Sequence, residues 1–101
     1  MATELQTQVW NQLKEISKGK VTTYSQLAQA VGRPRAVRAV ASAVGKNPNL
    51  VTVPCHRVVR SDGAVGQYAN GQKNKITLLK KEGIKITNNK IKLAEYLHTF
   101  T

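Results

Sequence analysis

Residues 23–45 read TYSQLAQAVGRPRAVRAVASAVG, which is two short amphipathic stretches on either side of one glycine. Thr23 is followed three residues later by Gln26, and this capping-box pattern marks the start of a helix. A helix over 24–31 is therefore expected, and Gly32 suits the position just past its end.

The second half of this stretch predicts another helix. Pro34 suits a first helical turn, and the apolar residues after it recur at helical spacing up to Gly45. Arg35, Arg38 and Ser42 lie three and four residues apart, so they share one face, opposite the valines. Small side chains lie near that face: Ala36, Ala39 and Ala43. Two short helices around a tight turn indicate a helix-turn-helix with a basic outer face, although a solvated charged face gives the same pattern.

The charge of the whole chain is strongly positive. Its 101 residues include 16 Lys and Arg against 5 Asp and Glu, a net charge of +11. Residues 33–60 hold basic side chains and no acidic one, whereas the lysines over 73–92 are expected mostly on solvated surfaces. This excess predicts a polyanionic partner, meaning nucleic acid or an anionic membrane surface.

With 41% hydrophobic residues the chain is too apolar for a disordered tail, and its length fits one domain over 1–101.

The rest of the chain divides into short elements. Apolar residues spaced three and four apart predict helices over 4–17 and 74–82. Residues 50–53 form a β-branched run, which we interpret as a buried strand that the following proline interrupts. Residues 84–93 predict a small hairpin, and 94–101 are assigned to a tail. The expected fold class is mainly α with short β elements.

Cys55 is the only cysteine, so no internal disulfide can form and a disulfide-stapled secreted domain is excluded. Residues 1–17 lack the basic start and apolar run of a signal peptide, and no apolar stretch approaches the ~20 residues that cross a bilayer. One cysteine and two histidines are too few soft ligands for a zinc site. We therefore expect an intracellular protein with a reduced thiol and no bound metal.

The sequence around the cysteine, PCHRV at 54–58, contains candidate catalytic groups. A lone cysteine is most often a buried structural residue. Here His56 and Arg57 follow it directly, and nearby imidazole and cationic groups stabilise a thiolate. Neighbouring side chains on a strand point to opposite faces, so a Cys–His relay requires the backbone to turn here or a water to bridge.

Six blocks of sequence follow one another along the chain. They are YSQLA at 24–28, RAV at 38–40, NP at 47–48, VPCHRV at 53–58, GA and GQY within 63–68, and LLKKEG at 78–83. Together they resemble the C-terminal domain of the O6-alkylguanine-DNA alkyltransferases, over about residues 9–84. The resemblance implies a winged-helix-like helix-turn-helix domain of the alkyltransferase C-terminal type, without the N-terminal domain that family members commonly carry.

The resemblance also implies a suicide reaction at the cysteine, with no cofactor. In this family the cysteine matching Cys55 accepts the alkyl group from O6 of a damaged guanine and keeps it as a thioether. The histidine matching His56 acts through a water as the base that makes the thiolate, and the glutamate matching Glu82 orients that histidine. Asn47 matches a residue that ties the helix-turn-helix to the active-site loop.

On the DNA side, the resemblance implies that the target base is flipped out of the duplex and that the helix binds in the minor groove. The arginine matching Arg38 fills the gap in the base stack, and the tyrosine matching Tyr24 pushes at the 3′ phosphate of the target. Tyr68 matches a tyrosine that hydrogen-bonds the flipped guanine. Three residues near Arg38 are expected to join it at the DNA: Arg35, Ala39 and Ser42.

The resemblance further implies that the backbone around Val58 and Ala69 lines the pocket for the flipped base. Asn70 stands where a glycine is frequent in the family. We expect Asn70 to narrow or polarise the pocket mouth and so to disfavour bulky alkyl groups.

Three functions stay open on the sequence. The favoured one is a DNA-repair alkyltransferase that reacts once with O6-alkylguanine in double-stranded DNA, as a monomer in solution with no membrane partner. The second is a non-catalytic relative that binds alkylated DNA and recruits other repair proteins, a class in which another residue, commonly Trp, replaces the cysteine. The third is a generic basic DNA-binding module with a structural thiol, which leaves Tyr68 and Glu82 without a purpose.

Overall fold

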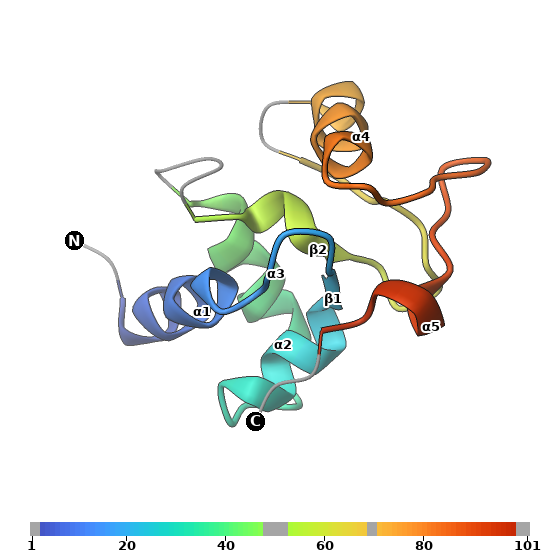
Figure 1. Ribbon diagram of the computed structural model, residues 1–101. Coiled ribbons are helices and arrows are strands. Elements are labelled where there is room, and N and C mark those ends of the chain that lie inside the picture. Colours follow the sequence, from blue (N-terminus) through green and yellow to red (C-terminus); the bar gives the residue numbers. More distant parts are fainter. Residues whose placement is uncertain (1–2, 48–52, 69–70, 99–101) are drawn as a thin grey trace.

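The computed structural model describes residues 3–47, 53–68 and 71–98. Its helices are α1 (Glu4–Lys14), α2 (Tyr24–Ala30), α3 (Val37–Gly45), α4 (Gln72–Lys81) and α5 (Leu93–Tyr96), with a 3-10 turn, η1, at Cys55–Arg57. The strands β1 (Thr22–Thr23) and β2 (Val58–Val59) pair in parallel (Figure 1). The expected class, mainly α with short β elements, is confirmed.

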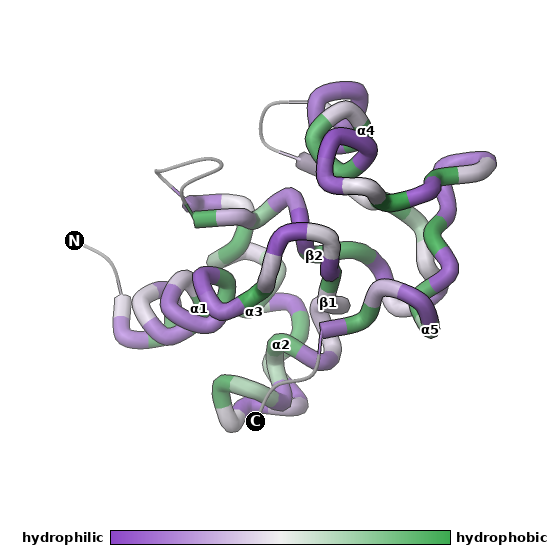
Figure 2. Tube along the Cα trace, viewed as in Figure 1, coloured by the Kyte–Doolittle hydropathy of each residue, from purple (hydrophilic) through white to green (hydrophobic). Residues whose placement is uncertain are grey.

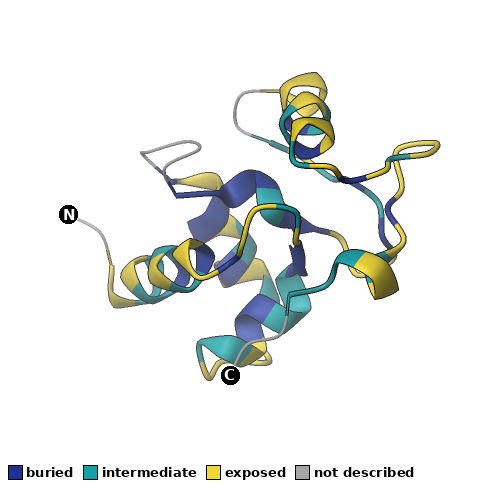
Figure 3. Ribbon diagram, viewed as in Figure 1, coloured by how far each residue is buried: buried dark blue, intermediate teal, exposed yellow. Residues whose placement is uncertain are grey.

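The small sheet lies between two hydrophobic cores. Consecutive residues of a strand face opposite sides, so Val58 packs with residues of α1, α2 and α3, while Val59 packs in a second core that includes Leu79 of α4. Both strands and most of η1 are buried (Figure 3). The segment that carries the cysteine is therefore held on both sides by packed side chains.

Helix α1 forms where the apolar spacing predicts it, but it ends at Lys14 rather than at residue 17. Val9 and Leu13 are fully buried, and Ile16 beyond the helix end remains buried as well. The indole Nε1 of Trp10 donates a hydrogen bond of 2.8 Å to the Ala43 carbonyl, which fastens α1 to α3.

Helix α2 begins and ends at the predicted signals. The Thr23 hydroxyl accepts a hydrogen bond of 3.1 Å from the Gln26 amide. Gln26 does not complete the capping box, because its Oε1 is buried without a partner among the described residues. Gly32 has a φ of +75°, and the Arg33 amide after it donates to the Ala28 carbonyl at 2.9 Å. This is the left-handed glycine stop that closes many helices.

The predicted start of the second helix at Pro34 was wrong, because α3 begins at Val37. The Ala36 amide donates to the Arg33 carbonyl at 2.9 Å, so these residues close a separate turn between the two helices. The fixed φ of proline suits the second position of such a turn as well as it suits a first helical turn. Arg35 consequently lies in the turn and not on α3.

The C-terminal part departs furthest from the sequence prediction. Of the hairpin expected over 84–93, only the turn is present: Thr87 and Lys90 exchange backbone hydrogen bonds of 3.0 and 2.9 Å. No strands flank this turn within residues 71–98, since Ile91 bonds to Gly63 instead and α5 follows at Leu93. Part of the assigned tail is docked, because the His98 amide donates to the Val21 carbonyl at 2.7 Å.

Helix α4 starts two residues before its predicted range and ends at Lys81, one residue short of it. Its sequence is largely hydrophilic (Figure 2). The apolar residues of this helix are Ile76, Leu78 and Leu79. Most of the strand expected over 50–53 lies outside the described residues, and Val53 at its end is buried.

Candidate functional site

A pocket of about 600 Å³ lies where α2, α3, η1 and the chain after β2 meet. Its wall includes Tyr24, Cys55 and Tyr68, three residues that the sequence predicted for one site. A volume of this size falls in the usual range for small-molecule sites, about 300–1,000 Å³. The fold therefore brings these three side chains to one cavity from three separate segments.

Cys55 opens the 3-10 turn and is only 4% exposed. The backbone thus turns at the cysteine, as the sequence required for a relay between neighbouring residues. Burial raises the pKa of the Cys55 thiol, against the opposing effects of a hydrogen bond from Asn47 and the charge of Lys75. A thiol with a raised pKa stays protonated at neutral pH, so it needs a base before it can act as a nucleophile.

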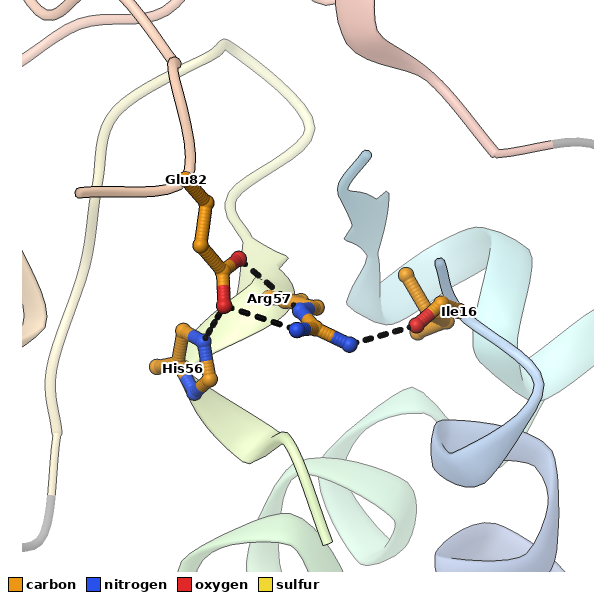
Figure 4. A network of polar contacts seen from close by, with 4 residues as sticks. All are labelled: Ile16, His56, Arg57 and Glu82. Carbon is orange, nitrogen blue, oxygen red and sulfur yellow. Dashed lines mark hydrogen bonds and ion pairs between the residues drawn. The ribbon is translucent and has the colours of Figure 1, made fainter. Parts of the chain in front are cut away.

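His56 and Arg57 both bind the Glu82 carboxylate, which lies directly after α4 (Figure 4). The His56 Nε2 is 3.0 Å from Glu82 Oε2. The Arg57 Nε donates to Oε1 at 2.9 Å and its Nη2 donates to Oε2 at 2.7 Å, a two-point contact that fixes the plane of the carboxylate. The Arg57 Nη1 donates to the Ile16 carbonyl at 2.6 Å. The Arg57 guanidinium therefore binds the Glu82 carboxylate, although the sequence places Arg57 close to the Cys55 thiol.

The protonation states of this pair follow from their surroundings. Burial raises the pKa of the Glu82 carboxyl, but the hydrogen bonds from Arg57 and His56 outweigh burial and hold that pKa below its ordinary value. Burial lowers the pKa of His56, and the bond to Glu82 opposes this only in part. A carboxylate can only accept, so the neutral imidazole carries its hydrogen on Nε2. The other nitrogen, Nδ1, is then an acceptor, and it is buried without a partner among the described residues.

Asn47 lies just past the end of α3 and is buried. Its Nδ2 donates a hydrogen bond of 2.6 Å to the Val53 carbonyl. The Cys55 amide donates to the same carbonyl at 2.7 Å. Asn47 therefore joins the end of α3 to the segment that leads into the reactive turn.

Two tyrosines keep their hydroxyl hydrogens at the pocket. Burial raises the pKa of both Tyr24 and Tyr68, and the proximity of Cys55 raises each of them further. The Tyr68 ring meets His56 edge to face, with ring centroids 6.4 Å apart. Both phenols are therefore available as hydrogen-bond donors above neutral pH.

Lys75 on α4 is a site residue that the sequence interpretation missed, because it was counted among the solvated lysines. It is fully buried, and its Nζ donates to the Val58 carbonyl at 2.7 Å and to the Gln67 carbonyl at 3.0 Å. Burial lowers the pKa of Lys75 from 10.5 to about 8. The available signal was its spacing, four residues before buried Leu79 on the same helix face.

Apart from Tyr24, the predicted DNA-facing residues and Val58 are not part of the described pocket wall. Arg38, Ala39 and Ser42 are exposed on α3, and Arg35 is exposed in the turn before it. Ala43, expected near the same face, is buried, because that side of α3 packs against α1. Val58 is fully buried with its carbonyl bound to Lys75 and is not in the pocket wall, while Ala69 and Asn70 lie outside the described residues.

The described residues offer neither a metal-binding cluster nor a membrane-spanning helix. No group of three or more His, Cys, Asp or Glu in residues 3–47, 53–68 and 71–98 could hold a metal ion. No helix in that part of the chain is long and apolar enough to span a bilayer.

The fold and the pocket together define a helix-turn-helix domain with a buried cysteine. The histidine and arginine that follow this cysteine both bind one glutamate. A family model described as 6-O-methylguanine DNA methyltransferase, DNA binding domain, matches residues 4–84. The chain belongs to this family.

Individual relatives agree with this assignment. A methylated-DNA–protein-cysteine methyltransferase of Methanosarcina acetivorans is 48% identical over 81 residues, which is 80% of this chain and 52% of that protein. The chain thus spans about half the length of this relative, and about a quarter of the regulatory protein Ada of Salmonella typhimurium.

Solved structures show the same fold. The crystal structure of Mycobacterium tuberculosis OGT in complex with DNA has a TM-score of 0.79 and 39% identity, covering 81% of this chain and 51% of that one. The structure of S. pombe Atl1 in complex with damaged DNA containing O6-carboxymethylguanine has a TM-score of 0.87 and 31% identity, covering 99% of this chain and 100% of that one.

Proposed function

We propose that this chain repairs DNA by transferring an alkyl group from O6 of guanine to the Sγ of Cys55, once per molecule. The observation that carries the proposal is the buried thiol in the pocket wall, followed in η1 by a neutral histidine whose Nε2 faces Glu82. This arrangement leaves Nδ1 as the basic atom, in a site where the thiol needs a base.

The proposed alkyl transfer needs no cofactor. A water molecule relays the proton of the Cys55 thiol to Nδ1 of His56, and Glu82 stabilises the imidazolium that forms. The thiolate attacks the alkyl carbon, so that a C–S bond forms, the C–O6 bond breaks, and the electron pair stays on the guanine oxygen. Tyr68 donates a hydrogen bond to the departing base, and the proton on the imidazolium returns through water to the guanine. The thioether is stable, so the molecule does not turn over.

The DNA would approach over the exposed face of α3. Arg38, Ala39 and Ser42 are exposed there, and Tyr24 lies at the start of α2 with its side chain in the pocket wall. A base must leave the duplex to expose O6, at a cost of a few kcal/mol. We assign to Arg38 the filling of the gap in the stack and to Tyr24 the displacement of the target's 3′ phosphate. Because phosphate contacts release counterions, affinity should fall steeply as salt rises.

Intact-protein mass spectrometry after mixing with an O6-methylguanine duplex tests the proposal. We expect a gain of one methyl group per molecule, located on Cys55 by peptide mapping. The Cys55→Ala variant, with unchanged DNA binding, should gain none. An unmodified Cys55 in a protein that binds the lesion would overturn the proposed transfer.

A second candidate function is lesion binding without transfer. The observation that favours it is the match to S. pombe Atl1, which covers nearly the whole of both chains in a complex with damaged DNA. The presence of a cysteine in the pocket wall favours transfer instead. The mass measurement separates the two functions.

A further inference from the structure

We propose that the turn at 87–90 is part of the rim of the alkyl pocket, and that Asn89 limits the size of the apolar alkyl groups the pocket accepts. This inference rests on the proposed function, because it concerns which lesion enters the same pocket. The turn lies beyond residues 4–84, the part of the chain that the family model matches.

Asn89 is one of the residues that line the pocket containing Cys55, Tyr24 and Tyr68. It is an exposed residue, which places it at the mouth of the cavity and not at its floor. Arg60 lines the same cavity and is also exposed, with only a loose ion pair of 3.8 Å to Asp62. The mouth is therefore polar, whereas the floor is made by buried side chains.

The turn is tied to the pocket wall on both sides of Ala64. The Val65 amide donates to the Asn89 carbonyl at 2.9 Å, and the Ile91 amide donates to the Gly63 carbonyl at 2.9 Å. Ala64 and Val65 themselves line the pocket. In Figure 1 the chain between α4 and α5 runs beside the segment that follows β2. A movement of the turn would thus require breaking bonds to the wall.

The close approach of these two segments depends on a glycine. A Cβ on Gly63 would lie 2.7 Å from the Ile91 carbonyl oxygen, which is closer than such atoms approach. Gly63 also has a φ of +88°, where glycine is favoured. Because Gly63 has no side chain, the Ile91 carbonyl can lie this close to the pocket wall.

The turn itself presents Asn89 in one backbone conformation. Asn88 and Asn89 have φ of 53° and 60°, and Thr87 and Lys90 close the turn with two mutual hydrogen bonds. Asparagine adopts the left-handed region more readily than most residues. An apolar group that extends from O6 past this position must desolvate the Asn89 amide without offering it a hydrogen bond, which is unfavourable.

The test compares Asn89→Gly with Asn88→Gly as a matched control. Glycine adopts the same positive φ at both positions, so the turn is retained, and only the first variant alters a residue of the pocket wall. Single-turnover transfer rates are measured on duplexes carrying O6-methylguanine and O6-benzylguanine. We expect Asn89→Gly to raise the benzyl-to-methyl rate ratio about tenfold, as when one polar group no longer has to be desolvated. Asn88→Gly should leave the ratio unchanged.

A binding measurement separates this inference from the proposed transfer. The same two substitutions are made in Cys55→Ala protein, and the Kd ratio for the two duplexes is measured. If the unsubstituted protein transfers nothing but Asn89→Gly still shifts this binding ratio toward the benzyl lesion, the proposed transfer fails and the rim assignment stands. If Asn89→Gly alters neither ratio, or alters both no more than Asn88→Gly does, the rim assignment is wrong.

Discussion

Lys75→Met is a substitution whose effect on stability should depend on pH in a calculable way. Lys75 is fully buried, and burial lowers its pKa from 10.5 to about 8. The difference of about 2.5 pKa units corresponds to about 3 kcal/mol at 1.36 kcal/mol per unit. Because the folded-state pKa lies below the unfolded one, the charged form is disfavoured by folding. This cost is fully present below pH 8 and disappears as the pH rises toward 10.5.

The assay is urea unfolding of the Lys75→Met variant and of the protein that keeps the lysine, at pH 7 and pH 10. Both proteins carry Cys55→Ala so that the thiol does not titrate. The lysine protein should gain about 2.5 kcal/mol relative to Lys75→Met between these two pH values. The hydrogen bonds to the Val58 and Gln67 carbonyls are lost in the variant at both pH values, so their contribution largely cancels. A difference between the two proteins that is constant with pH would refute the claim that Lys75 is charged and buried at neutral pH.

Further predictions concern the network and the backbone. Glu82→Gln removes the carboxylate that orients the imidazole, and the single-turnover methyl-transfer rate should fall about a hundredfold, with lesion binding kept. Because the pKa of His56 is lowered and the base must be neutral, the transfer rate should stay constant as the pH falls through 6.5 and decline only below it; a decline already centred above pH 6.5 contradicts this. Gly63→Ala should lower the free energy of unfolding by about 2–3 kcal/mol in urea, because of its positive φ and the close Ile91 carbonyl. Gly32→Ala, where φ is also positive but nothing lies within 4 Å of the added Cβ, should cost only about 1 kcal/mol.

Local signals in the sequence were sufficient for α1 and α2. The spacing that includes Val9 and Leu13, and the pairing of Thr23 with Gln26, involve residues within one or two turns of each other. The prediction of a helix start at Pro34 failed because the fixed φ of proline fits both a first helical turn and a separate turn. The hydrogen bond from the Ala36 amide to the Arg33 carbonyl decides between them, and the sequence does not reveal it.

The chemistry of the site depends on contacts between distant segments. Arg57 lies two residues after the cysteine in the chain, but its guanidinium binds Glu82, which comes 25 residues after Arg57. Lys75 is buried because carbonyls of Val58 and Gln67 accept its hydrogens, and neither carbonyl can be inferred from a helical pattern. The resemblance to the alkyltransferases identified Cys55 and its neighbours as candidates, and their roles stay predictions until the transfer is measured.

The position of β2 between two cores links the stability of this chain to its reactivity. Val58 and Val59 belong to different cores, and Cys55 lies only a few residues before them. A smaller side chain at Leu79 would leave a cavity in the second core and weaken the packing around Val59 of β2, although Leu79 is not in the described pocket wall. We therefore expect that variants selected only for resistance to heat or denaturant would also differ in their rate of alkyl transfer.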